Sequence, residues 1–202
     1  MTAAKKPRSS KKARKNIGFT DMIYDEKKVL LKNGKTVVLR SPSEDDWQAM
    51  IDYITCLASE TPYILRAPDE CDDTEQSERA FIRRYNESRL ECMIAVFDGD
   101  KVVGNCNLSI KNRNKVRHRA VLAIGLRKSH YRLGIGTTLI TELSIIARSV
   151  GCTQFELEYV DGNYRAKGLY EKCGFVEVGR MPRGVRFEDG TYADEVLMVK
   201  PL

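Results

Sequence analysis

The most regular pattern of apolar and polar positions in this chain lies between residues 119 and 150. A continuous apolar run from Ala120 to Leu126, with an arginine on either side, predicts a buried strand. Beyond Gly134-Ile135-Gly136 the apolar positions take the spacing of one helix face; they are Leu139, Leu143, Ile146, Ala147 and Val150. The expected order is therefore a strand, a glycine-containing turn and a helix.

Shorter patterns on both sides predict the other elements of an α/β chain. On the N-terminal side we expect strands at 29–31 and 36–40 around Asn33-Gly34, a helix that begins after 41–46, a helix at 74–86, and strands at 92–97 and 101–110. On the C-terminal side we expect a strand at 155–160, a turn at 161–163, a short helix ended by Gly174, and closing strands at 175–179 and 195–199.

The net charge of +6 comes from the N-terminus. Residues 1–16 hold seven basic side chains and no acidic one, so the rest of the chain carries 27 basic residues against 28 acidic ones. We therefore expect residues 1–20 to be a disordered tail and residues 21–202 to form a single domain. The tail is either a solubilising extension or a weak contact for nucleic acid.

Several classes of protein are disfavoured by the remaining composition. No apolar stretch approaches the roughly 18–20 residues that cross a bilayer, and the N-terminus lacks the apolar segment of a secretory signal. The six cysteines are scattered, and His118 and His130 are not spaced as metal ligands or beside a nucleophile. We expect a cytoplasmic monomer or homodimer with free thiols, no metal and no membrane contact.

The glycine turn is a candidate anion site. Glycine lets the backbone approach a ligand closely, and the free N–H groups of a helix's first turn favour an anion, most often phosphate. A P-loop needs a lysine after Gly136, where Thr137 stands, and a dinucleotide fingerprint needs a third glycine where Leu139 stands. By itself the turn is compatible with a phosphate ligand and equally with the plain beginning of a helix.

A second motif follows about thirty residues later: Asn163-Tyr-Arg-Ala166-Lys-Gly-Leu169-Tyr170-Glu-Lys-Cys-Gly174-Phe175. With the glycine turn before it, this segment resembles the GNAT superfamily of acyl-CoA-dependent N-acyltransferases, and the element order agrees from about residue 35 onward. The resemblance implies a mixed, mostly antiparallel central sheet with helices on both faces and a splayed central strand pair. It also implies transfer of an acetyl group from acetyl-CoA to a primary amine of a small molecule or a protein.

The same resemblance implies where acetyl-CoA binds. The coenzyme diphosphate would lie on the backbone N–H groups of Arg132, Leu133, Gly134, Ile135, Gly136 and Thr137. The pantetheine arm would lie along Ile124, Gly125 and Leu126 like an added strand. Asn163 would either lie near this arm or cap the short helix, and both roles are compatible.

Tyr170 is the candidate general acid that the resemblance implies, because a departing thiolate needs a proton. Its spacing with Ala166 and Leu169 is also that of a core tyrosine on a helix face. An attacking amine must lose a proton, and Glu158 is our preferred base over Glu156; both could equally lie on a solvated strand face.

The chain departs from the family pattern at two positions. Relatives often carry an acid near position 121, where this chain has Val121, so the base is not assigned by the motif. Tyr131 stands where the family usually has arginine or glutamine, which puts cofactor affinity in question more than cofactor identity. We expect direct attack without an acyl-enzyme, although Cys106 and Cys173 stay open as nucleophiles.

Acidic segments suggest a cationic acceptor. In this fold the acceptor site lies between the loop joining the first two helices and the segment before the last strand; the acidic or aromatic residues there are Asp69, Glu70, Asp72 and Asp73, and Tyr192, Asp194 and Glu195. Acidic walls attract a cationic amine, although the same loops could simply face solvent. The alternative function is a non-catalytic, CoA-binding sensor or scaffold whose basic tail contacts nucleic acid.

Overall fold

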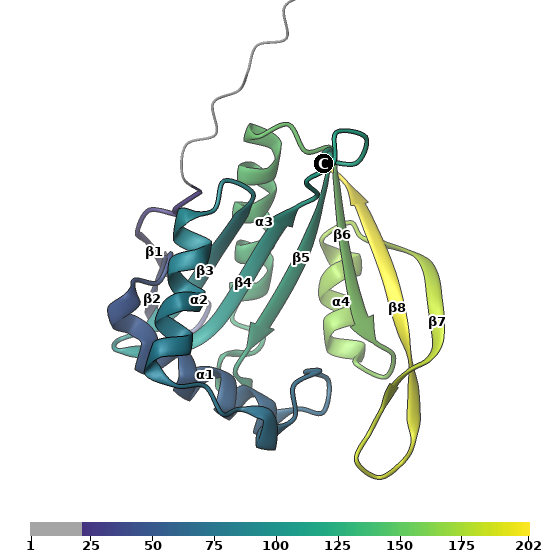
Figure 1. The fold of residues 1–202 in the computed structure, drawn as a ribbon, viewed down its shortest axis with the longest axis horizontal. Coiled ribbons are helices and arrows are strands. Elements are labelled where there is room, and N and C mark those ends of the chain that lie inside the picture. Colours follow the sequence, from purple (N-terminus) through teal and green to yellow (C-terminus); the bar gives the residue numbers. More distant parts are fainter. Residues whose placement is uncertain (1–21) are drawn as a thin grey trace, which may run out of the picture.

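One eight-stranded sheet runs through residues 22–202, the part of the chain that the computed structural model describes (Figure 1). In spatial order its strands are β1 (Lys27–Leu30), β2 (Thr36–Arg40), β3 (Glu91–Asp98), β4 (Lys101–Ile110), β5 (Arg119–Leu126), β6 (Gln154–Val160), β8 (Tyr192–Pro201) and β7 (Val176–Arg186). All neighbours pair antiparallel except β5 and β6, which are parallel. The mixed, mostly antiparallel sheet is confirmed, whereas the expected tail at 1–20 lies outside the described residues.

Helices cover both faces of this sheet, as expected (Figure 1). The helices α1 (Trp47–Glu60) and α2 (Glu75–Glu87) pack on one face, where Tyr53 and Ile82 join Met93 in one apolar cluster. The helices α3 (Ile135–Ser149) and α4 (Tyr164–Lys172) pack on the other, where Leu139 and Phe155 belong to a second cluster. Burying one apolar stripe from each helix holds the two layers to the sheet.

The parallel pair β5 and β6 separates partway along its length. Pairing runs from Arg119 opposite Gln154 to Val121 opposite Glu156 and then stops, although both strands continue. Figure 1 shows the two strands meeting near the C-terminus and diverging toward the α1–α2 loop. This is the splayed central strand pair that the resemblance implied.

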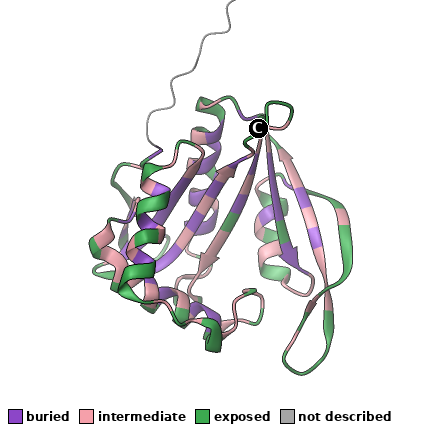
Figure 2. Ribbon diagram, viewed as in Figure 1, coloured by how far each residue is buried: buried purple, intermediate pink, exposed green. Residues whose placement is uncertain are grey.

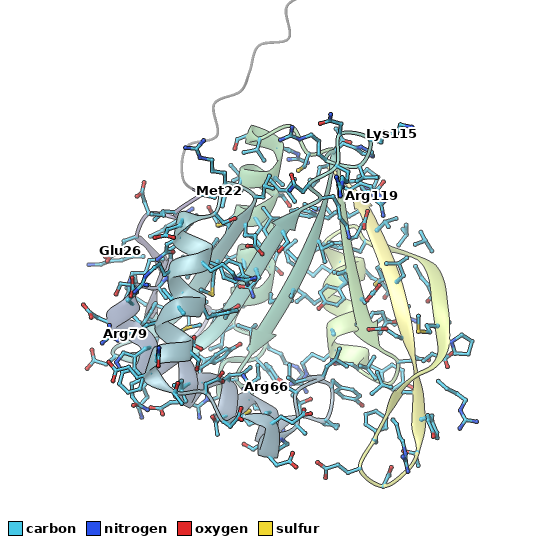
Figure 3. The ribbon with its side chains drawn as sticks, viewed as in Figure 1. Met22, Glu26, Arg66, Arg79, Lys115 and Arg119 are labelled. Carbon is cyan, nitrogen blue, oxygen red and sulfur yellow. The ribbon has the colours of Figure 1, made fainter. Side chains whose placement is uncertain are left out.

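An ion pair joins the two strands at their closed end. The Arg119 guanidinium donates to the carboxylate of Glu156, whose residue is only 6% exposed. Burial alone would raise the pKa of Glu156, but the hydrogen bond and charge of Arg119 hold it below its ordinary value. Figure 3 shows Arg119 at this end of the sheet, with Arg66 at the opposite end. The ion pair therefore links β5 and β6 in their paired part, next to the point where the two strands separate.

The closing strands differ from the expectation. Instead of short strands at 175–179 and 195–199 with a loop between them, β7 and β8 form a long hairpin that turns at 187–191. Two register shifts, after Glu177 and after Met181, break the alternation of apolar and polar residues in β7. As an edge strand, β7 is also largely exposed (Figure 2), so its polar sequence gives little strand signal. The other expected elements agree to within a few residues at their ends.

A buried carboxyl predicts a pH-dependent stability. Glu78 of α2 is 7% exposed, and burial, aided by the nearby Asp73 carboxylate, raises its pKa to about 7. The folded state therefore binds this proton more tightly than the unfolded chain, and its contribution to stability is lost as the pH rises from about 4.5 to 7. We expect Glu78→Gln to increase the free energy of unfolding by about 1–3 kcal/mol at pH 8 and to change it little at pH 5.

Urea denaturation at the two pH values measures this difference. Glu87→Gln, at the exposed end of the same helix, is the matched control and should behave alike at both. An equal effect of Glu78→Gln at pH 5 and pH 8 would contradict the assignment.

Candidate functional site

A cleft of about 1190 Å³ opens between the separated ends of β5 and β6. Its walls come from β5, the β5–α3 loop, the first turn of α3, β6, α4 and the beginning of the α1–α2 loop. Pockets for drug-sized ligands usually measure about 300–1,000 Å³. The cleft can therefore hold an extended ligand of coenzyme size.

Most of the site residues expected from the sequence lie together in this cleft. Those that line it are Ile124, Gly125, Leu126, Arg132, Gly134, Ile135, Gly136, Thr137, Glu158, Asn163 and Tyr170. Leu133 does not line it, because its side chain packs against the core and its carbonyl accepts the Lys32 N–H at 3.4 Å. The expectation for Leu133 concerned its backbone N–H alone.

The turn before α3 presents backbone N–H groups. Gly134 caps the helix with φ +95° and Arg132 has φ +62°, so the chain twice enters the left-handed region. The hydrogen bond from Thr138 N–H to Gly134 O closes the first turn, which leaves the preceding N–H groups without a helical acceptor. A Cβ at Gly136 would lie 2.7 Å from the Leu169 Cδ2 atom, so a larger residue would require the Leu169 side chain of α4 to move. This donor cluster suits an anion such as a diphosphate.

One edge of β5 is free for a ligand. Beyond Val121 its backbone has no partner strand on the side of β6 within residues 22–202. On the face toward α1, a Cβ at Gly125 would lie 2.6 Å from the Tyr53 hydroxyl and 2.7 Å from Leu57. A larger residue at Gly125 would therefore meet these α1 side chains, while the free edge of β5 can bond the amides of an extended chain.

Tyr170 combines a core position with a place in the cleft. The residue is 6% exposed, and its ring lies 6.1 Å from that of Tyr159 and 5.8 Å from that of Phe175. Its hydroxyl forms no hydrogen bond with the described residues, and burial raises the pKa of the phenol well above its ordinary value. The phenol therefore stays protonated at neutral pH and is available as a donor.

Asn163 caps α4. Its side-chain oxygen accepts the Ala166 N–H at 3.2 Å, which is the capping role weighed from the sequence. Since Asn163 also lines the cleft, a contact to a ligand stays compatible with the cap.

The two candidate bases, Glu156 and Glu158, lie in different environments. Glu156 is buried and bound to Arg119, whereas Glu158 is exposed and lines the cleft. Glu195 of β8 lines the cleft beside Glu158, and burial together with the Glu158 carboxylate raises the pKa of Glu195. The cleft therefore contains a pair of carboxylates, Glu158 and Glu195, although Val121 stands where relatives often carry an acid.

The acidic α1–α2 loop does not form the acceptor wall. None of Asp69, Glu70, Asp72 and Asp73 lines the cleft, which is lined instead by residues 60–65 of the same segment. Arg66 pairs with Asp73 at 2.6 Å and with Asp72 at 3.6 Å, and the Glu70 carboxylate accepts the Ala67 N–H. The expected acidic wall is not found in the cleft lining, and Arg66 pairs with only two of the four acids. Of Tyr192, Asp194 and Glu195, which lie within β8, only Glu195 lines the cleft.

The thiols left open by the sequence lie outside the cleft lining. Cys106 is fully buried in the core, and Cys173 is partly buried at the end of α4; burial raises the pKa of both thiols. Residues 22–202 contain no group of three or more metal-ligating side chains placed to hold an ion. In the same range, every helix is too short or too polar to span a membrane.

Sequence comparison decides the family. The model of the acetyltransferase (GNAT) family matches residues 54–175, which include both motifs and most of the cleft. The chain belongs to the GNAT acetyltransferase family. No curated protein shows significant sequence similarity to it.

Solved structures share the fold. An acetyltransferase of the GNAT family from Streptococcus pneumoniae is 26% identical, with a TM-score of 0.76 over 82% of this chain and 99% of that one. The yncA protein of Salmonella typhimurium, solved with its cofactor acetyl-CoA, is 18% identical, with a TM-score of 0.69 over 83% and 95%. A ribosomal-protein-alanine N-acetyltransferase from Brucella melitensis is 22% identical, with a TM-score of 0.69 over 81% and 99%.

Cations from distant segments line the cleft of this GNAT chain. They are Lys32, Lys128, Arg165 and Lys172, together with Arg132, and none of the first four stands at a named position of either motif. Lys32 comes from the β1–β2 turn, which is joined to the β5–α3 loop by its backbone N–H. Such a cluster favours a ligand with several phosphate charges.

Arg165 offers a replacement for the arginine or glutamine that Tyr131 displaces. The Arg165 guanidinium lies over the Tyr131 ring, 4.0 Å from its centroid, so α4 brings a guanidinium to the position where the loop lacks one. Stacking on an aromatic face orients this group without neutralising it.

We therefore expect Arg165→Ala to weaken coenzyme A binding about tenfold, the effect of losing one charge-assisted contact. Isothermal titration calorimetry at low and high salt measures this loss, which should shrink as salt rises. Arg148→Ala, an exposed arginine at the far end of α3, is the control and should bind as the wild type does. Unchanged affinity in Arg165→Ala would contradict the role.

Proposed function

We propose that this chain transfers the acetyl group of acetyl-CoA to a primary amine of a small molecule or a protein, by direct attack of the amine. The observation that carries the proposal is the convergence in one cleft of an anion-binding turn, a free strand edge and a buried phenol without a partner. Each suits a different part of an acyl-CoA substrate.

The donor substrate would be held along its length by backbone groups. The N–H groups of 132–137 and the surrounding cations would bind the diphosphate, and the free edge of β5 at 124–126 would bind the pantetheine amides. Backbone donors need no rearrangement on binding, so the thioester would be placed reproducibly near Tyr170.

Tyr170 would supply the proton for the leaving sulfur. A thiolate is a poor leaving group unless a proton or hydrogen bond reaches it as the bond breaks. The raised pKa of the phenol keeps that proton on Tyr170 until the thiolate forms. The absence of Cys106 and Cys173 from the cleft lining supports direct attack over an acyl-enzyme.

Glu158 would act as the base for the acceptor. An alkylamine with a pKa of about 10.4 is mostly an ammonium ion at neutral pH and cannot attack until it loses a proton. Glu158 is exposed to the cleft and, among residues 22–202, no arginine or lysine pairs with it, in contrast to Glu156.

Thiol release from acetyl-CoA across a panel of primary amines tests the function. With the best amine, we expect Tyr170→Phe to lower kcat by about 10²–10⁴-fold, the usual contribution of a positioned acid, and to leave the Kd for coenzyme A unchanged. Tyr24→Phe removes a hydroxyl that donates to Glu142 outside the cleft, and it should retain activity. Full turnover in Tyr170→Phe would remove this residue as the acid.

The panel also separates the enzyme from the alternative sensor. A sensor would bind coenzyme A in calorimetry yet release no thiol with any amine. The enzyme should bind the coenzyme and release thiol in proportion to the acetylated amine formed.

A further inference from the structure

Glu195 lies diagonally across from Glu158 on the cleft face of the sheet. In the β6–β8 ladder, Val160 is opposite Glu195 and Glu158 is opposite Leu197. Because residues two apart in a strand share a face, both carboxylates project from the same face, and both line the cleft. Diagonal neighbours on adjacent strands lie within reach of long side chains.

A bulge in β7 packs against the backbone of β8 at Glu195. The register shifts between Met181 and Val185, and Arg183 takes φ +55° within the bulge. A Cβ at Gly184 would lie 2.9 Å from the Glu195 Cβ, and the Arg183 N–H donates to the Asp194 carboxylate at 3.0 Å. Bulges often re-aim a side chain beside a functional site, and this one fixes the strand that carries Glu195.

The charges around Glu195 leave the carboxylate pair unneutralised. Glu158 is the charged group that acts on Glu195, and both it and burial raise the pKa of Glu195. Arg180, the nearby cation of β7, is bound to Asp161 at 2.7 Å and to Glu177 at 2.6 Å. Among residues 22–202, no lysine or arginine forms an ion pair with either carboxylate of the pair.

A second observation ties the pair to a ligand. Tyr170 lines the same cleft; the residue is only 6% exposed, and its hydroxyl has no hydrogen-bond partner among the described residues. Asp72 and Asp73 of the α1–α2 loop, which pair with Arg66, do not line this cleft. The pair therefore lies in the cleft that contains the proposed chemistry, and it offers negative charge to whatever enters there.

We propose that Glu195 acts through Glu158, so that the two carboxylates receive the acceptor as an alkylammonium ion and remove its proton. This inference rests on the proposed function. Glu195 is a positioning residue: its carboxylate lies beside Glu158 and adds to the attraction that holds the cation against it.

The protons balance as follows. The ammonium nitrogen gives one proton to Glu158, and the pair releases it to water. The freed amine forms the C–N bond as the C–S bond breaks, Tyr170 gives its proton to the sulfur, and the second nitrogen proton restores the phenol. An acceptor that arrives as a cationic amine therefore releases one proton for each acetyl group transferred.

Glu195→Gln tests the pair through the pH dependence of kcat/KM for an active amine. Glu195 is the carboxyl of the pair whose pKa is raised, so removing it should move the acidic limb of the profile to lower pH by about 0.5–1 pH unit. The KM for the ammonium substrate should rise about 3- to 10-fold, while the Kd for coenzyme A stays unchanged. Glu188→Gln, an exposed acid in the β7–β8 turn, is the control and should keep the wild-type limb.

A direct titration separates this inference from the activity. Carboxyl ¹³C NMR should show that Glu158→Gln lowers the pKa of Glu195. An active wild type whose Glu195→Gln variant keeps the wild-type acidic limb would overturn the inference alone. A wild type that releases no thiol with any amine would overturn the proposed function, and this inference with it. A limb that moves together with the NMR shift supports the pair.

Discussion

The structure depends on the early end of the pairing between β5 and β6. A strand inside a sheet normally satisfies its backbone on both sides, and an unpaired edge is costly when buried. Here the edge is left open beyond Val121 and Glu156, while helices pack on either face of the sheet. The Arg119–Glu156 ion pair links the two strands in their paired part. The unused donors and acceptors of the backbone are free to bond an extended ligand, and the cleft is a property of the sheet itself.

The charge of the cleft follows the same division. Lysine and arginine side chains line the same cleft as the first turn of α3, which presents N–H groups and the positive end of the helix dipole. Carboxylates lie on β6 and β8, on the other wall. A ligand with phosphates is attracted to one part and a cation to the other, so two substrates of opposite charge can be sorted within one opening.

The sequence was most informative where function and local structure use the same residues. The apolar run of β5, Gly134 and Gly136, and the stripe that ends at Tyr170 are local patterns, and the structure brings them to one cleft. Lys32 and Arg165 could not be found this way, because their role depends on which loops meet in the fold. The acids at 69–73 lie outside the cleft lining, and two of them, Asp72 and Asp73, pair with Arg66 of the same loop, a contact that the sequence pattern does not reveal. The β7 bulge beside Glu195 could not be predicted, because an exposed, polar edge strand has no apolar alternation that a register shift would interrupt.

One aromatic residue, Tyr63, contacts segments that are distant from it in sequence. The Tyr63 hydroxyl donates to Gly162 O at 3.0 Å, which ties the α1–α2 loop to the turn before α4. Its ring meets Phe187, at the turn of the β7–β8 hairpin, with centroids 6.4 Å apart. The Tyr63 side chain therefore contacts both the turn that follows β6 and the turn that precedes β8, the two strands that carry Glu158 and Glu195. Variation in these segments would leave the backbone groups of β5 and α3 unchanged, because the two walls of the cleft are built from separate elements.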